Sequence, residues 1–147
     1  ISVALPPTSA SDSRVAAARH CAVDDHFADA NVPQVTAWLV DSGSPLDLID
    51  REDASCCEQF MRQGAKVRLS TANGETASSE VLPLRLSRLD ETIQPHVLEA
   101  TPNVLSLGRR IVVDGYSFYW PAWSLSPWLE HPRTGERIVL EVRDFVP

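Results

Sequence analysis

The sequence predicts a mainly β domain with one or two short helices. Three observations lead to this prediction: short apolar runs that stop at turn signals, stretches in which Leu or Val alternates with polar residues, and Asn-Gly or Asp-Gly dipeptides between them. Runs of this kind are typical of β-strands, whereas an amphipathic helix repeats every 3.6 residues. No apolar run approaches the ~20 residues that a membrane-spanning helix needs.

The first strands are expected on both sides of an acidic turn. The apolar run 35–40 predicts a buried strand that ends at Asp41-Ser42-Gly43, and 46–49 predicts a second short strand. Residues 51–64 favour a helical turn or a loop.

A hairpin is expected next. Alternating residues 67–71 and 82–86 flank Asn73-Gly74, a dipeptide that favours a type I′ turn because both of its central residues need positive φ. Residues 92–98 are another candidate strand.

The last third of the core combines a helix with strands. Residues 103–113 are apolar and favour a helix, and 116–120 favour a strand after the Asp114-Gly115 turn. Residues 121–132 are rich in Pro and predict irregular structure, and 137–142 predict a closing strand.

Three segments follow from this pattern. Residues 1–33, rich in Pro, Ser and Ala near their start, predict a linker or N-terminal extension with one short helix over 14–22. Residues 34–120 predict the core, and 121–147 a C-terminal loop and strand that belong to the core or to an interface. Because the chain begins with Ile1 rather than Met, we expect it to be a piece of a longer polypeptide.

Charge and cysteine content narrow the function. The net charge is −7 and no basic patch is visible, which argues against a nucleic-acid partner. The three cysteines are Cys21, Cys56 and Cys57, a poor disulfide framework that favours a reducing intracellular compartment.

Asp41-Ser42-Gly43 is the motif with the clearest chemical meaning. A strand that delivers Asp to a tight turn places its carboxylate where backbone amides can hold it, and Gly43 lets the backbone approach closely. Two such carboxylates that face each other share one proton, so one acts as base toward a water and the other as acid toward a carbonyl. The structural alternative is an ordinary Asx-type turn after a strand.

The segment Trp38-Leu39-Val40-Asp41-Ser42-Gly43-Ser44 resembles the active-site segment of retroelement aspartic proteases. Residues 67–75 and 101–108, followed by Gly115-Tyr116-Ser117-Phe118, resemble the copia-type retrotransposon members of that family. The resemblance covers about residues 35 to 120. It implies a retropepsin-like fold, in which each chain forms half of a pepsin-like barrel and a homodimer completes the barrel. Residues 34–120 would then be the protease core, and residues 1–33 would derive from the polyprotein.

The resemblance also implies roles for single residues. Asp41 would be the catalytic residue, with Ser42, Gly43 and Ser44 in its loop. Asn73 and Gly74 would lie at the tip of a flap over the substrate. Structural support would come from Leu107, Gly108, and an ion pair between Arg109 and Asp47.

The function expected from this resemblance is an aspartic endopeptidase that processes a retroelement polyprotein. The chain has one Asp-Ser/Thr-Gly triplet and the mechanism needs two, so a homodimer is expected. The substrate would be an extended peptide or polyprotein, with no cofactor, no metal, no nucleic acid and no membrane. The protein would lie in the cytoplasm or within retroelement particles.

The alternative is a retropepsin-fold module that dimerises or binds peptides without catalysis, because the flap region has few glycines. An unrelated β-domain with a chance triplet is a third option.

Two other groups of residues are candidates for a metal site or a binding surface. His20, Cys21 and His26 are too few for a metal site, which needs about four ligands. Trp120, Trp123 and Trp128 could line a substrate or dimer surface, although packing against the core is favoured.

Overall fold

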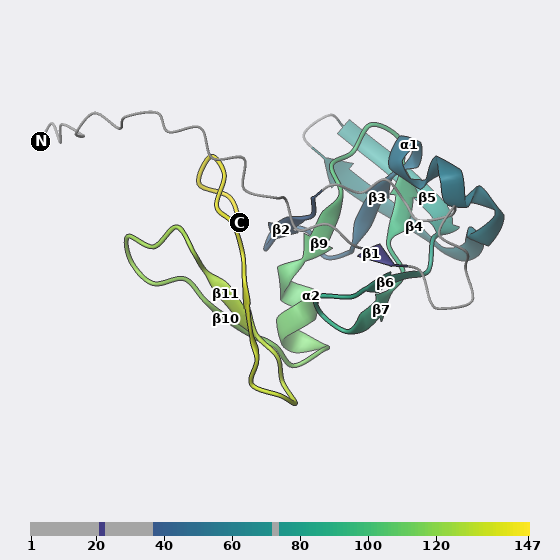
Figure 1. Cartoon of the computed structure of the whole chain (residues 1–147). Coiled ribbons are helices and arrows are strands. Elements are labelled where there is room, and N and C mark those ends of the chain that lie inside the picture. The colour runs from purple at the N-terminus through teal and green to yellow at the C-terminus, as the bar shows by residue number, and fades with distance from the viewer. Residues whose placement is uncertain (1–20, 23–36, 72–73) are drawn as a thin grey trace, which may run out of the picture.

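A computed structural model describes residues 21–22, 37–71 and 74–147 of the chain (Figure 1). These residues are mostly β, as the sequence predicts, with two short α-helices and one 3-10 helix. The helices are α1 (Arg51–Ala54), η2 (Ser55–Phe60) and α2 (Leu107–Val112). The strands are β1 (Cys21–Ala22), β2 (Leu39–Asp41), β3 (Leu48–Asp50), β4 (Arg62–Thr71), β5 (Gly74–Val81), β6 (Leu84–Leu86), β7 (Glu91–Ile93), β8 (His96–Leu98), β9 (Val104–Ser106), β10 (Ser117–Tyr119), β11 (Trp128–Glu130) and β12 (Arg137–Val139).

The largest sheet has six strands in the order β2-β9-β3-β8-β5-β4. Strand β9 comes late in the chain, yet it lies between the consecutive strands β2 and β3. It runs parallel to β2 and antiparallel to β3, where Leu48 lies opposite Val104. The apolar segment that the sequence places after the hairpin therefore packs directly beside the strand that carries Asp41.

The hairpin of this sheet is formed by β4 and β5. Its first arm includes the expected residues 67–71, but the expected second arm over 82–86 is wrong. The second arm is Gly74–Val81, and Leu84–Leu86 form β6 in another sheet. Thr71 lies opposite Gly74, so residues 72 and 73 connect the strands and lie outside the described residues. Gly74 is already the first residue of β5, with φ +114°, a conformation that favours glycine. Gly74 therefore belongs to strand β5. The pairing shifts between Gln63 and Val67, which marks a bulge in β4.

Some expected elements differ from the structure. The helix predicted over 14–22 is wrong for its last two residues, because Cys21 and Ala22 pair with β6 as strand β1. Residues 92–98 form parts of two strands, β7 and β8, which belong to different sheets and are separated at Pro95. The helix expected over 103–113 begins only at Leu107, after β9.

The C-terminal segment packs into the same core as the rest. Strands β10, β11 and β12 form a three-stranded sheet that crosses the predicted boundary at residue 120. Leu129 and Ile138 are buried in the main apolar cluster, and the Val40 N–H donates to the Pro147 carbonyl at 3.0 Å. Residues 121–147 therefore support the strand that ends at Asp41.

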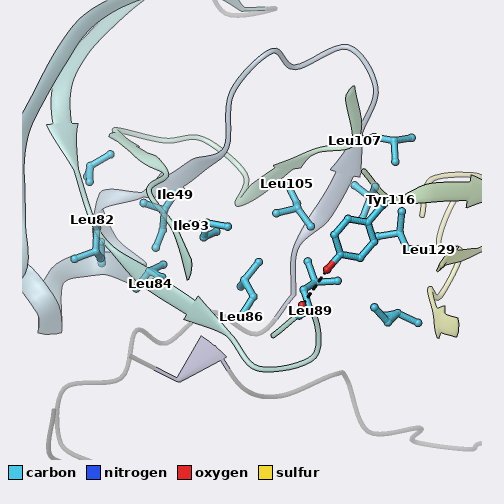
Figure 2. Close-up of a cluster of buried hydrophobic side chains, with 14 of the residues drawn as sticks. Ile49, Leu82, Leu84, Leu86, Leu89, Ile93, Leu105, Leu107, Tyr116 and Leu129 are labelled. Carbon is cyan, nitrogen blue, oxygen red and sulfur yellow. Dashed lines mark hydrogen bonds between the residues drawn. The ribbon is translucent and has the colours of Figure 1, made fainter. Parts of the chain in front are cut away.

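The core lies among β3, β6, β7, β9, α2 and the C-terminal sheet (Figure 2). Its labelled side chains come from all these elements, and Ile49, Leu82 and Leu129 have no exposed surface. Burying each such side chain stabilises the fold by about 1.5–3 kcal/mol. Tyr116 is the polar member of the cluster, and its hydroxyl donates to the Leu89 carbonyl at 2.9 Å. A smaller apolar cluster of Leu48, Leu98 and Val104 is also buried.

Candidate functional site

Asp41 is the last residue of β2, and its side chain is partly exposed. The Gly43 N–H donates to Asp41 Oδ1 at 2.7 Å, so the turn backbone holds the carboxylate. A Cβ at position 43 would lie 3.2 Å from the same oxygen, and a side chain there would crowd it. Ser42 and Gly43 are exposed. The predicted loop therefore exposes the backbone of Gly43 and the residue Ser42, beside the partly exposed carboxylate of Asp41.

The neighbouring strand β9 pairs with the backbone of the strand that carries Asp41. Leu39, Val40 and Asp41 lie opposite Val104, Leu105 and Ser106 in parallel register. The Ser44 hydroxyl donates to the Leu46 carbonyl at 2.7 Å within the loop. The loop is thus held both by its own turn and by a strand from the later part of the chain.

Ser106 connects the Asp41 loop to α2, a role that our sequence reasoning missed. Its side chain is fully buried, and its hydroxyl donates to the Ser44 carbonyl at 2.6 Å. The same hydroxyl accepts from the Arg109 N–H at 3.2 Å and so caps the helix. A Ser placed just before a short helix was the available signal.

The predicted ion pair between Arg109 and Asp47 is wrong, because the buried Asp47 pairs with Arg110 instead. Arg110 Nη2 lies 2.8 Å from Asp47 Oδ2, and the Ser106 N–H donates to Asp47 Oδ1 at 2.8 Å. Arg109, the predicted partner, is exposed. Consecutive helical residues point about 100° apart, so only one of the two arginines can face the core.

Arg110 is surrounded by carboxylates. Besides Asp47, it pairs with Glu91 at 2.5 Å and with Asp114 at 3.1 Å, while its own side chain is only 2% exposed. Burial raises the pKa of the Asp47 carboxyl, although the Arg110 charge and the Ser106 N–H both act to lower it. This network ties the segment after the Asp41 loop to α2 and β7.

The other predicted site residues differ in how buried they are. Leu107 is buried and packs in the main core. Gly108 is exposed, and a Cβ there would meet nothing within 4 Å, so no neighbour requires glycine at this position. Gly74 is exposed near the hairpin tip, and Asn73 lies outside the described residues.

The expected packing of the tryptophans is wrong in two of three cases. Trp123 is fully exposed and Trp120 is 42% exposed. Trp128 is half-buried and stacks on Tyr119, with ring centroids 5.2 Å apart.

Within the described part of the chain, no cluster of three or more His, Cys, Asp or Glu could hold a metal ion. His20, His26 and the side chain of Cys21 lie outside it. The described helices are too short or too polar to cross a membrane.

The chain was compared with protein-family models, curated proteins and solved structures. No protein-family model, no curated protein and no solved structure matches this chain.

Proposed function

We propose that the chain is one subunit of a homodimeric aspartic endopeptidase of the retropepsin type. The observation that carries the proposal is the setting of Asp41: a carboxylate at the end of a strand, held by the turn that follows it, with β9 alongside. A retropepsin site needs this pairing of an Asp-bearing strand with a later apolar strand.

The proposed reaction uses the two Asp41 carboxylates of a dimer. When they face each other at close range they share one proton, because two adjacent negative charges are unfavourable. The ionised group removes a proton from water as it attacks the peptide carbonyl, and the protonated group donates to the carbonyl oxygen. The exposed Ser42 and Gly43 leave room for a second copy of the loop.

Exposed apolar side chains favour a second copy as the partner. Val112 and Val113 at the end of α2 are 84% and 67% exposed, and Trp123 and Leu125 between β10 and β11 are also exposed. Large exposed apolar residues often mark protein interfaces. We assign these two segments to the subunit interface.

The β4–β5 hairpin supports an extended peptide or polyprotein segment as the substrate. In this proposal the hairpin is the flap, and the peptide binds beneath it as an additional strand. The source of such a polyprotein would be a retrotransposon of the copia type. The protease would then act in the cytoplasm or inside the particles of that retrotransposon.

Peptide cleavage by an Asp41→Asn variant tests the proposal. The matched control is Asp90→Asn, because Asp90 is exposed and its φ of +51° suits asparagine equally well. With a peptide library as substrate, we expect Asp41→Asn to lose cleavage and Asp90→Asn to keep it. Full activity in Asp41→Asn would refute the catalytic assignment. A dimer that binds peptides but cleaves none at acidic or neutral pH would favour the silent module instead.

A further inference from the structure

A pocket lies apart from the Asp41 loop. It has a volume of about 760 Å³ and is bounded by the start of β4, the β7–β8 segment, α2 and the turn after β11. Neither Asp41 nor any residue of its loop lines this pocket. Pockets of this size hold small organic ligands.

The lining of this pocket is rich in arginine. Arg62, Arg109 and Arg133 line it, all three are exposed, and within the described ranges none lies in ion-pair distance of a carboxylate. The acidic lining residues Glu91 and Asp114 already pair with Arg110. The pocket region therefore holds four arginines, Arg110 included, against three carboxylates, those of Glu91, Asp114 and the nearby Asp47. This local excess of positive charge stands out in a chain whose net charge is −7.

Two buried histidines, His96 and His131, also line the pocket. His131 Nδ1 accepts from the Arg133 and Thr134 N–H groups at 3.2 and 3.3 Å, so the neutral ring carries its proton on Nε2. His96 is 9% exposed, and its Nδ1 has no hydrogen-bond partner among the described residues.

We propose that this pocket binds a small molecule bearing an oxyanion, that is, a phosphate or carboxylate group. Guanidinium groups match both anions because their planar N–H fork donates two parallel hydrogen bonds. Arg109 of α2 and Arg133 of the turn after β11 line the pocket from two separate segments of the chain, with Arg62 of β4 as a third. The site is independent of Asp41, so it stands whether or not the chain is a protease.

Isothermal titration of the whole chain with inorganic pyrophosphate, and separately with citrate, tests this site. The test variants are Arg109→Gln and Arg133→Gln. Arg68→Gln is the matched control, because Arg68 is exposed on β4 but does not line the pocket. We expect saturable binding of at least one anion that weakens about tenfold in each test variant, as loss of one charge-assisted hydrogen bond predicts. Arg68→Gln should change it less than about twofold, and Asp41→Asn should bind as the native chain does.

The anion that binds more tightly identifies the group that the pocket takes. Two results would overturn the proposal: no saturable binding of either anion up to about 10 mM, or equal weakening by Arg68→Gln and the pocket variants. The second result would mean that the anions respond only to overall charge. Because Arg109 and Arg133 are exposed, unchanged urea unfolding of the variants is the control for folding.

Discussion

Replacing Arg110 by Met tests the buried ion-pair network beside the candidate site. The Arg110 side chain is 2% exposed and that of Asp47 is 4% exposed, so the substitution leaves a buried carboxylate without its cation. Removing one partner of a buried pair costs about 3–5 kcal/mol. For a chain of this size, that loss corresponds to a decrease in Tm of about 6–20 °C.

The cost should also depend on pH. Burial already raises the pKa of Asp47 above its ordinary value of 3.8, and the Arg110 charge is the main influence that lowers it. Without Arg110 the pKa of Asp47 rises further. A carboxyl with a raised folded-state pKa contributes stability that is present at low pH and is lost as the pH rises through that pKa. The deficit of Arg110→Met should therefore be larger at pH 8 than at pH 5.

Urea unfolding at both pH values, followed by tryptophan fluorescence, measures this deficit. Arg109→Met is the matched control, since its side chain is exposed one residue away, and it should change the unfolding free energy by less than about 0.5 kcal/mol. Adding Asp47→Asn to Arg110→Met should restore part of the loss, because it removes the unpaired charge. A cost below about 1 kcal/mol, or a deficit that is larger at pH 5, would refute the reasoning.

Three further predictions concern single buried groups. Ser106→Ala removes the hydrogen bond to the Ser44 carbonyl and the cap of α2, so it should lower the unfolding free energy by about 1–3 kcal/mol. The control Ser117→Ala, at an exposed serine, should not change the unfolding free energy measurably. Tyr116→Phe should cost about 1–3 kcal/mol in the same assay because the Leu89 carbonyl loses its donor, and a cost equal to that of the exposed Tyr119→Phe would contradict this. Burial, together with the neighbouring Cys56, raises the pKa of Cys57 to about 12, and the Cys57 side chain has no exposed surface. In a Cys21→Ser/Cys56→Ser variant, burial alone should still keep the Cys57 thiol from reacting with Ellman's reagent at pH 8 until the chain unfolds, and rapid labelling of the folded chain would disprove this.

Local signals in the sequence were sufficient for the elements nearest the candidate site. The apolar run before Asp41 and the alternating residues 67–71 are local signals, and the strand end and the first arm of the hairpin lie where these signals place them. The second arm does not, because Gly74–Val81 rather than 82–86 pairs with β4. Asp47 was identified through the family resemblance, which implies an acidic residue soon after the Asp-Ser-Gly triplet as the partner of a later arginine.

Features set by tertiary contacts could not be predicted in this way. Arg109 and Arg110 are identical in type and adjacent, and only the packing of α2 decides which one is buried. Cys21 and Ala22 follow a helix-favouring segment, yet pairing with β6 makes them a strand, because contacts distant in sequence override weak local preference. The arginine pocket combines β4, α2 and the turn after β11, which no local pattern relates.

The central claim is that hydrolysis requires one Asp41 from each of two subunits. It is tested most directly by mixing the native chain with a threefold excess of Asp41→Asn and measuring peptide cleavage after the subunits have exchanged. Random pairing leaves about a quarter of the native chains with a native partner, so cleavage should fall to about a quarter of that of the native chain alone. Cleavage that remains unchanged at this excess would show that a single Asp41 suffices, and would contradict the account.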